Sequence, residues 1–293
     1  MTPTVLGLGM VQAPLADPDP RVHRLPRLEQ MAVGAVRQAL GARAATGSLG
    51  LVFATGYGGL AATEAYLRSI ATRGMAFGSP TAFHQSVHHS AAGQLSLLFE
   101  LRGPVLTLSQ RELSGEAALR AGLMHLDRVD RVLVVAADER TPGLDAGYRA
   151  FGADFRPSEG AAAVLLGPGP GPLRIERCAL FSHPTSARRF ASTARFGPHL
   201  AASIAIPASD RTVSIAAPNA SVEQAERSIL GPEARVLEDA PGAARVGFHP
   251  SAGLVRFVAA ARRLLTTSGD SRCVLHGLAL GGGQSITVLR HVT

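Results

Sequence analysis

The stretch "LTLSQRELSGEAAL", residues 106–119, joins an apolar strand-like run to a helix-like run. A tight turn from a strand into a helix often displays an enzyme nucleophile. The polar side chains at this turn are Ser109, Glu112 and Ser114. Neither serine lies in a G-x-S-x-G pattern and no histidine base can be assigned to them, so serine hydrolysis is not indicated.

Glu112 has three interpretations from the residues around it. Ser109 and Glu112 have the S-x-x-E spacing of a capping box, in which both side chains bond the first amides of a helix. Alternatively, the carboxylate fills a vestigial binding site beside Arg111, or it acts as a catalytic acid. The capping box is the preferred interpretation, with packing or capping also expected for Ser114.

Other residue clusters are poor candidates for metal or phosphate chemistry. His84, His88 and His89 have partly helical spacing, but no acid or thiol ligand accompanies them, so no metal is predicted. The run Gly281–Gly283 lacks the lysine and serine of a phosphate-binding loop and precedes a strand, which predicts a tight bend. Cys178 and Cys273 are far apart and are expected to be core thiols. No cofactor is expected.

The charge and the apolar pattern exclude several classes of function. All 29 basic residues are arginines, which excludes Schiff-base chemistry and a lysine base. The net charge of +7 would attract an acidic partner, although aromatic residues are only 5% of the chain and no nucleic-acid pattern is present. The apolar runs are too short to span a membrane and the N-terminus lacks an export signal, so a cytoplasmic protein is expected.

Strand-like and helix-like segments alternate along the first part of the chain, which predicts an α/β fold with buried parallel strands. Strands are expected at 4–11, 49–55, 105–109 and 131–137, and helices at 27–43 and 116–126. The "GPGPGP" run at 167–172 can continue neither a helix nor a central strand. It predicts a linker between two units, 1–170 and 171–293.

The second part repeats this plan more briefly, which suggests an internal duplication. A strand and turn are expected at 213–221 and a helix at 221–230 with Ser221 as its cap. A periodic helix at 252–265 and a closing hairpin with a glycine-rich bend at 273–290 follow.

With these segments in order, the chain resembles the β-ketoacyl synthases of the thiolase superfamily. The motifs that carry the resemblance are "SPTAFHQSVHHSAAGQLSLLFELRGP" (79–104), "VLTLSQRELSG" (105–115), "DRVLVVAADE" (130–139), "FRPSEGAAAVLL" (155–166) and "GLALGGGQSITVLR" (277–290). The resemblance implies a thiolase-like fold, in which duplicated α/β halves form a layered αβαβα sandwich. It also implies that Ser109, Ser114, Gly115, Gly282 and Gly283 belong to the nucleophile elbow and the last glycine-rich loop.

The resemblance also implies that the catalytic groups have been lost. Counted from Gly103, the tenth position of the family pattern carries the catalytic cysteine, and here that position is Glu112. A carboxylate is a poor nucleophile toward a thioester, whereas a thiolate at a helix N-terminus suits acyl transfer. Of the two family histidines, the first has no counterpart, and His249 is two residues nearer the following Ala-Gly than the pattern requires.

A synthase-like subunit without its cysteine resembles a chain-length factor, which pairs with an active synthase. The predicted function is therefore a non-catalytic partner that shapes the acyl or polyketide tunnel in type II polyketide or fatty-acid-like biosynthesis, on chains borne by acyl carrier protein. Leu60, Thr63 and Leu67, on one face of a helix starting near Gly59, are the candidate tunnel wall. The alternatives are plain core for this face, and a stand-alone acyl-thioester hydrolase or decarboxylase using Glu112 or His249.

Overall fold

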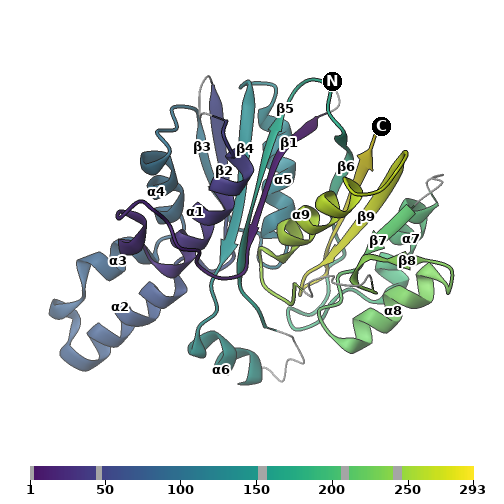
Figure 1. Ribbon diagram of the computed structural model, residues 1–293. Helices are drawn as coiled ribbons and strands as arrows, with labels where there is room; N and C mark the ends of the chain where they lie inside the picture. Colours follow the sequence, from purple (N-terminus) through teal and green to yellow (C-terminus); the bar gives the residue numbers. More distant parts are fainter. Residues whose placement is uncertain (1–2, 44–47, 151–156, 206–210, 240–245) are drawn as a thin grey trace.

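The computed structural model describes residues 3–43, 48–150, 157–205, 211–239 and 246–293. Strands and helices alternate along most of this chain (Figure 1). In chain order the elements are β1 (Thr4–Val11), η1 (Val22–Arg24), α1 (Arg27–Leu40), β2 (Leu49–Ala54), α2 (Leu60–Arg73), η2 (Met75–Phe77), α3 (Pro80–Ser86), α4 (Ser90–Leu98), β3 (Val105–Leu108), α5 (Ser114–His125), β4 (Arg131–Asp138), α6 (Pro142–Ala150), β5 (Gly160–Gly167), β6 (Leu173–Ser182), α7 (Thr193–Ile204), β7 (Arg211–Ser214), α8 (Ala220–Leu230), β8 (Arg235–Val236), η3 (Leu237–Asp239), α9 (Ala252–Leu264), β9 (Ser271–Leu278) and β10 (Gly283–His291).

The first five and the last five strands have the same order. The sheet runs β3-β2-β4-β5-β1-β6-β10-β9-β7-β8, so reading inward from either edge gives the third, second, fourth, fifth and first strand of a set. In each set the second strand pairs in parallel with the third and fourth, and the fifth pairs antiparallel with the fourth and first. The two sets meet where β1 pairs antiparallel with β6.

The expected elements are present, and the four strands expected in the first part run in one direction, but an antiparallel strand, β5, is inserted among them. β2, β3 and β4 pair in parallel and β1 points the same way, whereas β5, which lies between β4 and β1, runs antiparallel to both. Strands buried on both faces read as continuous apolar runs whatever their direction, so the sequence pattern did not carry the orientation. The strand at 105–109 was also expected to be buried, yet β3 lies at the edge of the sheet and Val105 is exposed.

The helices form layers around the strands. α1 packs on β1, β4 and β5, and α7 packs on β9 and β10. α5 contacts β2 and β4 of the first set and also β6, while α9 contacts β1 and β5 and also β9 and β10. Because α5 and α9 also contact each other, they form a helical layer shared by the two strand sets. Leu119 of α5 and Phe257 of α9 belong to the largest apolar core cluster.

Two local expectations concern the ends of elements. The helix expected at 221–230 begins one residue earlier, and its cap is Asn219, whose side chain accepts a hydrogen bond from the Val222 amide at 3.0 Å. Ser221 was therefore the wrong cap, because an asparagine two residues upstream is an equally good one. The closing hairpin is present as β9 and β10, which pair antiparallel around the glycine-rich bend.

No helix among the described residues is long and apolar enough to cross a bilayer.

Candidate functional site

The turn between β3 and α5 is a compact elbow. Arg111 has a left-handed backbone with φ of 51°, an uncommon conformation for a residue with a Cβ. The Ser114 hydroxyl accepts from the Gln110 amide at 2.9 Å and donates to the Arg111 carbonyl at 2.6 Å. These two bonds hold the turn in shape.

The capping-box interpretation of Ser109 and Glu112 was wrong. α5 begins only at Ser114, its N-cap position is Leu113, and no side chain caps it. The Ser109 hydroxyl instead donates to the Gly56 carbonyl at 3.3 Å. The reason is the sharp turn at Arg111, which delays the start of the helix past the residues that the spacing would have used. Glu112 therefore has no capping role.

Glu112 is buried at the floor of the elbow with 7% of its surface exposed. Burial raises the pKa of its carboxyl, while the amides of Glu112 itself and of Leu280 and the nearby Arg111 charge oppose that rise. Among the described residues, its Oε2 atom has no hydrogen-bond partner. Glu112 is thus a poorly solvated acid that faces its own backbone amide and the amide of Leu280, from the segment just before the glycine-rich bend.

The glycine-rich bend between β9 and β10 lies against this elbow, as expected. Gly281 and Gly282 have left-handed φ angles of 83° and 92°. A Cβ on Gly282 would lie 1.7 Å from the His183 carbonyl oxygen, and one on Gly283 would lie 3.1 Å from Leu113 Cδ1. Glycine is required here because the backbone turns left-handed and approaches its neighbours closely.

The starts of α5 and α9 meet beneath the elbow. The Gly115 amide donates to the Pro250 carbonyl at 3.2 Å, and a Cβ on Gly115 would lie 2.7 Å from the Leu254 nitrogen. Glycine at this position therefore lets two helices from the two strand sets touch through their backbones.

Three polar residues beside Glu112 were missed by the sequence analysis. The hydroxyls of Tyr57 and Tyr148 lie 2.9 Å apart, and burial together with the Glu112 and Asp138 charges raises the pKa of Tyr57. Asp138 is buried and accepts hydrogen bonds from Thr55, Gly56, Tyr57 and Ser251. A signal was available, because Asp138 and Thr55 stand at the carboxyl ends of parallel strands, where α/β proteins gather functional side chains.

His249 lies just before α9 and is buried. Only 2% of it is exposed, and neither ring nitrogen has a hydrogen-bond partner among the residues that the structure describes. Burial lowers the pKa of the imidazole to about 3, with the charge of Arg256 acting in the same direction. A Cβ on Gly160 would lie 3.6 Å from His249 Nε2, so the ring packs beneath β5.

The remaining candidates lie elsewhere. Leu60, Thr63 and Leu67 are on α2 as expected, with Leu60 and Thr63 half-buried and Leu67 58% exposed. His84, His88 and His89 are exposed, and the described residues contain no group of three or more histidine, cysteine, aspartate or glutamate side chains able to hold a metal.

Neither cysteine can replace a lost nucleophile. Cys178 is in β6 and Cys273 in β9, and burial raises the pKa of Cys178 to about 11 and that of Cys273 further still. The thiolate is the reactive form, so neither thiol is activated. What the elbow offers chemically is a desolvated acid beside two amides and two phenols.

Comparison with solved structures identifies relatives of this fold. The chain matches a structure described as the ishigamide ketosynthase/chain length factor with a TM-score of 0.76 at 18% identity, covering all of both chains. It matches AntDE:AntF, a type II polyketide synthase acyl carrier protein in complex with its ketosynthase bound to the hexaketide, with a TM-score of 0.76 at 14% identity, over 100% of this chain and 99% of that one. A β-ketoacyl synthase from Burkholderia phymatum STM815 matches with a TM-score of 0.72 at 14% identity over the full length of both.

Among curated protein sequences none matches the chain significantly. The profile of the β-ketoacyl synthase N-terminal domain matches residues 17–221, well over half of the chain and including the elbow. The mixed α/β fold with its shared helical layer agrees with the ketosynthase structures. The chain therefore belongs to the β-ketoacyl synthase N-terminal domain family.

Proposed function

We propose that this protein is a non-catalytic chain-length factor that pairs with an active β-ketoacyl synthase and shapes the tunnel for the growing acyl or polyketide chain. The observation that carries the proposal is Glu112 at the elbow, where its carboxyl occupies the space beside the amides of Glu112 and Leu280. Acyl attachment needs a thiolate there, and a carboxylate would form at best a labile anhydride. Carbon–carbon bond formation is then the task of the partner.

The repeated strand order supports a thiolase-like αβαβα sandwich of two duplicated halves. Both sets share strand order and pairing directions, and α5 and α9 lie between them. On this basis the halves are 1–170 and 171–293, with the division after β5 ends at Gly167 and before β6 begins at Leu173.

An exposed apolar surface beside the edge strand is the proposed contact with the synthase. β3 is an edge strand, and such strands offer unpaired amides and carbonyls to another chain. Val105 on β3 is exposed, and Leu97 on the contacting helix α4 is 74% exposed. Burial of apolar side chains next to a strand edge is a common way to form a stable interface. Similar structures include a ketosynthase/chain length factor and an acyl carrier protein in complex with its ketosynthase, which supports pairing with another protein.

The proposed tunnel wall is the α2 face that carries Leu60, Thr63 and Leu67. The exposed Leu67 would gain an apolar environment only when a second subunit or an acyl chain covers it. Because these side chains are of moderate size, the expected product is of medium or long chain length. The net charge of +7 is proposed to help dock an acidic acyl carrier protein or the synthase.

Co-expression with a candidate synthase tests both parts of the proposal. The pair should copurify as a heterodimer that condenses carrier-bound substrates, whereas this protein alone should show no condensation and no acyl transfer. Leu67→Phe should shorten the product because one more acyl unit would overlap the larger ring. Ala65→Phe, at an exposed position of the same helix off that face, is the matched control and should leave product length unchanged. An unchanged product with Leu67→Phe removes α2 from the wall.

A stand-alone hydrolase or decarboxylase gains no support from the site. A base with a pKa of about 3, such as His249, accepts a proton too weakly to drive hydrolysis near neutral pH. Acyl transfer by the purified single chain that is abolished by Glu112→Ala would nevertheless reinstate this alternative.

A further inference from the structure

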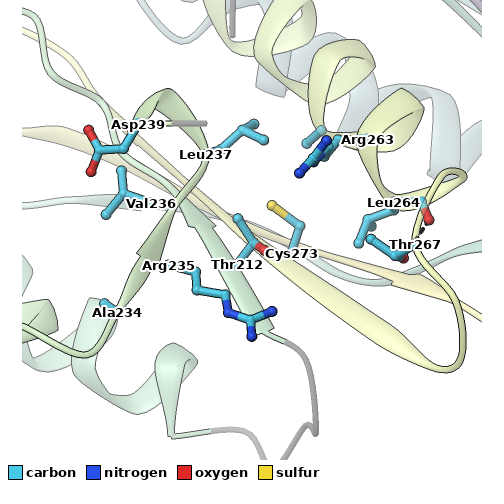
Figure 2. A pocket seen from close by; sticks show the side chains of 11 residues that line it. Thr212, Ala234, Arg235, Val236, Leu237, Asp239, Arg263, Leu264, Thr267 and Cys273 are labelled. Carbon is cyan, nitrogen blue, oxygen red and sulfur yellow. Dashed lines mark hydrogen bonds between the residues drawn. The ribbon is translucent and has the colours of Figure 1, made fainter. Parts of the chain in front are cut away.

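A cavity far along the chain from the elbow is not explained by a chain-length role. It has a volume of about 340 Å³ and lies between the short edge strand β8, the strands β7 and β9, and the last turns of α9 (Figure 2). Pockets that hold small organic ligands begin at about 300 Å³. The cavity exists because small side chains face it, namely Thr212, Ala260 and Cys273.

The inner wall of the cavity is apolar. Val236, Leu237, Ala260, Leu264 and Cys273 line it and are buried. Burial raises the pKa of the Cys273 thiol, so this side chain behaves as a small neutral group. Such a wall accommodates a short apolar chain or ring rather than a fully hydrated ion.

The rim of the cavity is cationic. Arg263 and Arg235 line it and are exposed, and Figure 2 shows the Arg263 side chain directed from α9 toward Cys273 and Leu237. The acid in the lining, Asp239, bonds the Arg227 guanidinium at 2.8 Å. An arginine fork suits carboxylate and phosphate oxygens in bidentate geometry.

We infer that this cavity binds a small organic anion with an apolar body, whose carboxylate or phosphate bonds Arg263 at the rim while its apolar part lies against Val236, Leu264 and Cys273. This inference is independent of the proposed pairing with a synthase, because the described residues that line the cavity all lie within 212–273 and none belongs to the elbow.

Calorimetric titration of the purified full chain tests the inference with three probes that share one tail: octanoate, octyl phosphate and octanol. Octanoate and octyl phosphate should bind saturably, and whichever binds more tightly identifies the preferred head group. Octanol should bind at least fivefold more weakly, because it cannot form the charge-assisted bonds to Arg263.

Variants separate this cavity from any acyl site near the elbow. Arg263→Gln should weaken octanoate at least fivefold and leave octanol unchanged, whereas Arg128→Gln removes the same charge from an exposed position in the first strand set and should have no effect. Ala260→Leu should fill the cavity and abolish binding, and Ala259→Leu, the adjacent position outside the lining, should not. Thermal unfolding of each variant confirms that it folds.

The inference fails if neither anion binds at millimolar concentration, if octanol binds as tightly as octanoate, or if binding survives in Ala260→Leu. Should Ala260→Leu not fold, the exposed Arg263→Gln decides the outcome: unchanged octanoate binding in that variant overturns the proposal. Neither result bears on product length or on the heterodimer, so failure here is distinguishable from failure of the chain-length role.

Discussion

Two neighbouring regions of this protein each bury an acidic side chain, and the two acids differ in how completely they are hydrogen-bonded. Asp138, at the end of β4, accepts hydrogen bonds from Thr55 Oγ1 at 2.9 Å, the Gly56 amide at 2.8 Å and the Ser251 hydroxyl at 2.5 Å. Glu112, in the elbow, has an Oε2 atom that no described residue hydrogen-bonds. Both acids lie near Tyr57, since both charges raise the pKa of that phenol.

We interpret Asp138 as an acid that stabilises the fold, and Glu112 as an acid whose position in the elbow serves function rather than stability. A fully bonded buried carboxylate ties its surroundings together, and here the Ser251 bond links the first strand set to the start of α9 in the second. A buried acid with an unused oxygen costs free energy and is retained only if something other than stability requires it. In the proposed chain-length role, that requirement is to keep the elbow closed to acyl attachment.

Asp138→Ala should produce the largest effect of any substitution in either region. It strands several buried donors, each of which costs about 1–3 kcal/mol when unsatisfied, so the free energy of unfolding should fall by about 3 kcal/mol or more. Urea unfolding measures this loss. A loss smaller than that of a typical surface substitution would show that Asp138 does not hold the two sets together.

The pH dependence of that loss sharpens the comparison. Burial raises the pKa of Asp138 from 3.8 to about 6. Its stabilising contribution is therefore fully present below pH 3.8 and is lost as the pH rises through about 6. The penalty of Asp138→Ala should accordingly be larger at pH 5 than at pH 8. A penalty that grows toward pH 8 would mean that hydrogen bonding outweighs desolvation and lowers this pKa.

Ser251→Ala removes one bond to Asp138 and should have an intermediate effect. A hydrogen bond to a charged group contributes about 1.5–3 kcal/mol, and the bond from Ser251 is buried. Ser109→Ala is the matched control, because that exposed hydroxyl makes a long bond of 3.3 Å to Gly56 and should change stability by less than about 0.5 kcal/mol. Equal losses in the two serine variants would contradict a special role for the Asp138 cluster.

The sequence predicted most elements of this fold and the position of the elbow, but not the contacts that distinguish the two acids. The apolar runs of β2 and β4 and the periodicity of α1 and α9 are local signals, and these elements lie close to the expected residues. The partners of Asp138 are 83 residues away at Thr55 and 113 residues away at Ser251. Only the sheet order brings such residues together, and no local pattern encodes it.

The elbow shows that a local sequence pattern can also fail to predict structure over only a few residues. The S-x-x-E spacing of Ser109 and Glu112 is a good local predictor of capping, yet the left-handed Arg111 moves the helix start to Ser114. The β3-to-α5 turn must approach the Gly281–Gly283 bend, which lies over 160 residues further along the chain. A tertiary contact of this kind overrides a capping preference of about 1 kcal/mol.

Glu112→Gln should have the smallest effect and the opposite sign. Burial raises the pKa of Glu112, so the contribution of its protonated form is present below the ordinary value of 4.5 and is lost as the pH rises through the raised pKa. Glutamine keeps the shape and never ionises, so the variant should be more stable than wild type at pH 8, by on the order of 1 kcal/mol, and nearly equal to it at pH 4.5. Glu159→Gln is the contrast: partial burial is outweighed there by the bonds that the carboxylate accepts from the Arg27 guanidinium and the Arg140 amide, which lower its pKa, so its loss should lower stability at pH 8. The free energy of unfolding of both variants, measured from pH 4.5 to 8, checks these signs.

A Glu112→Gln variant that is less stable than wild type at pH 8 would contradict the comparison. It would mean that the elbow amides stabilise the Glu112 carboxylate as strongly as the four hydrogen-bond donors stabilise that of Asp138.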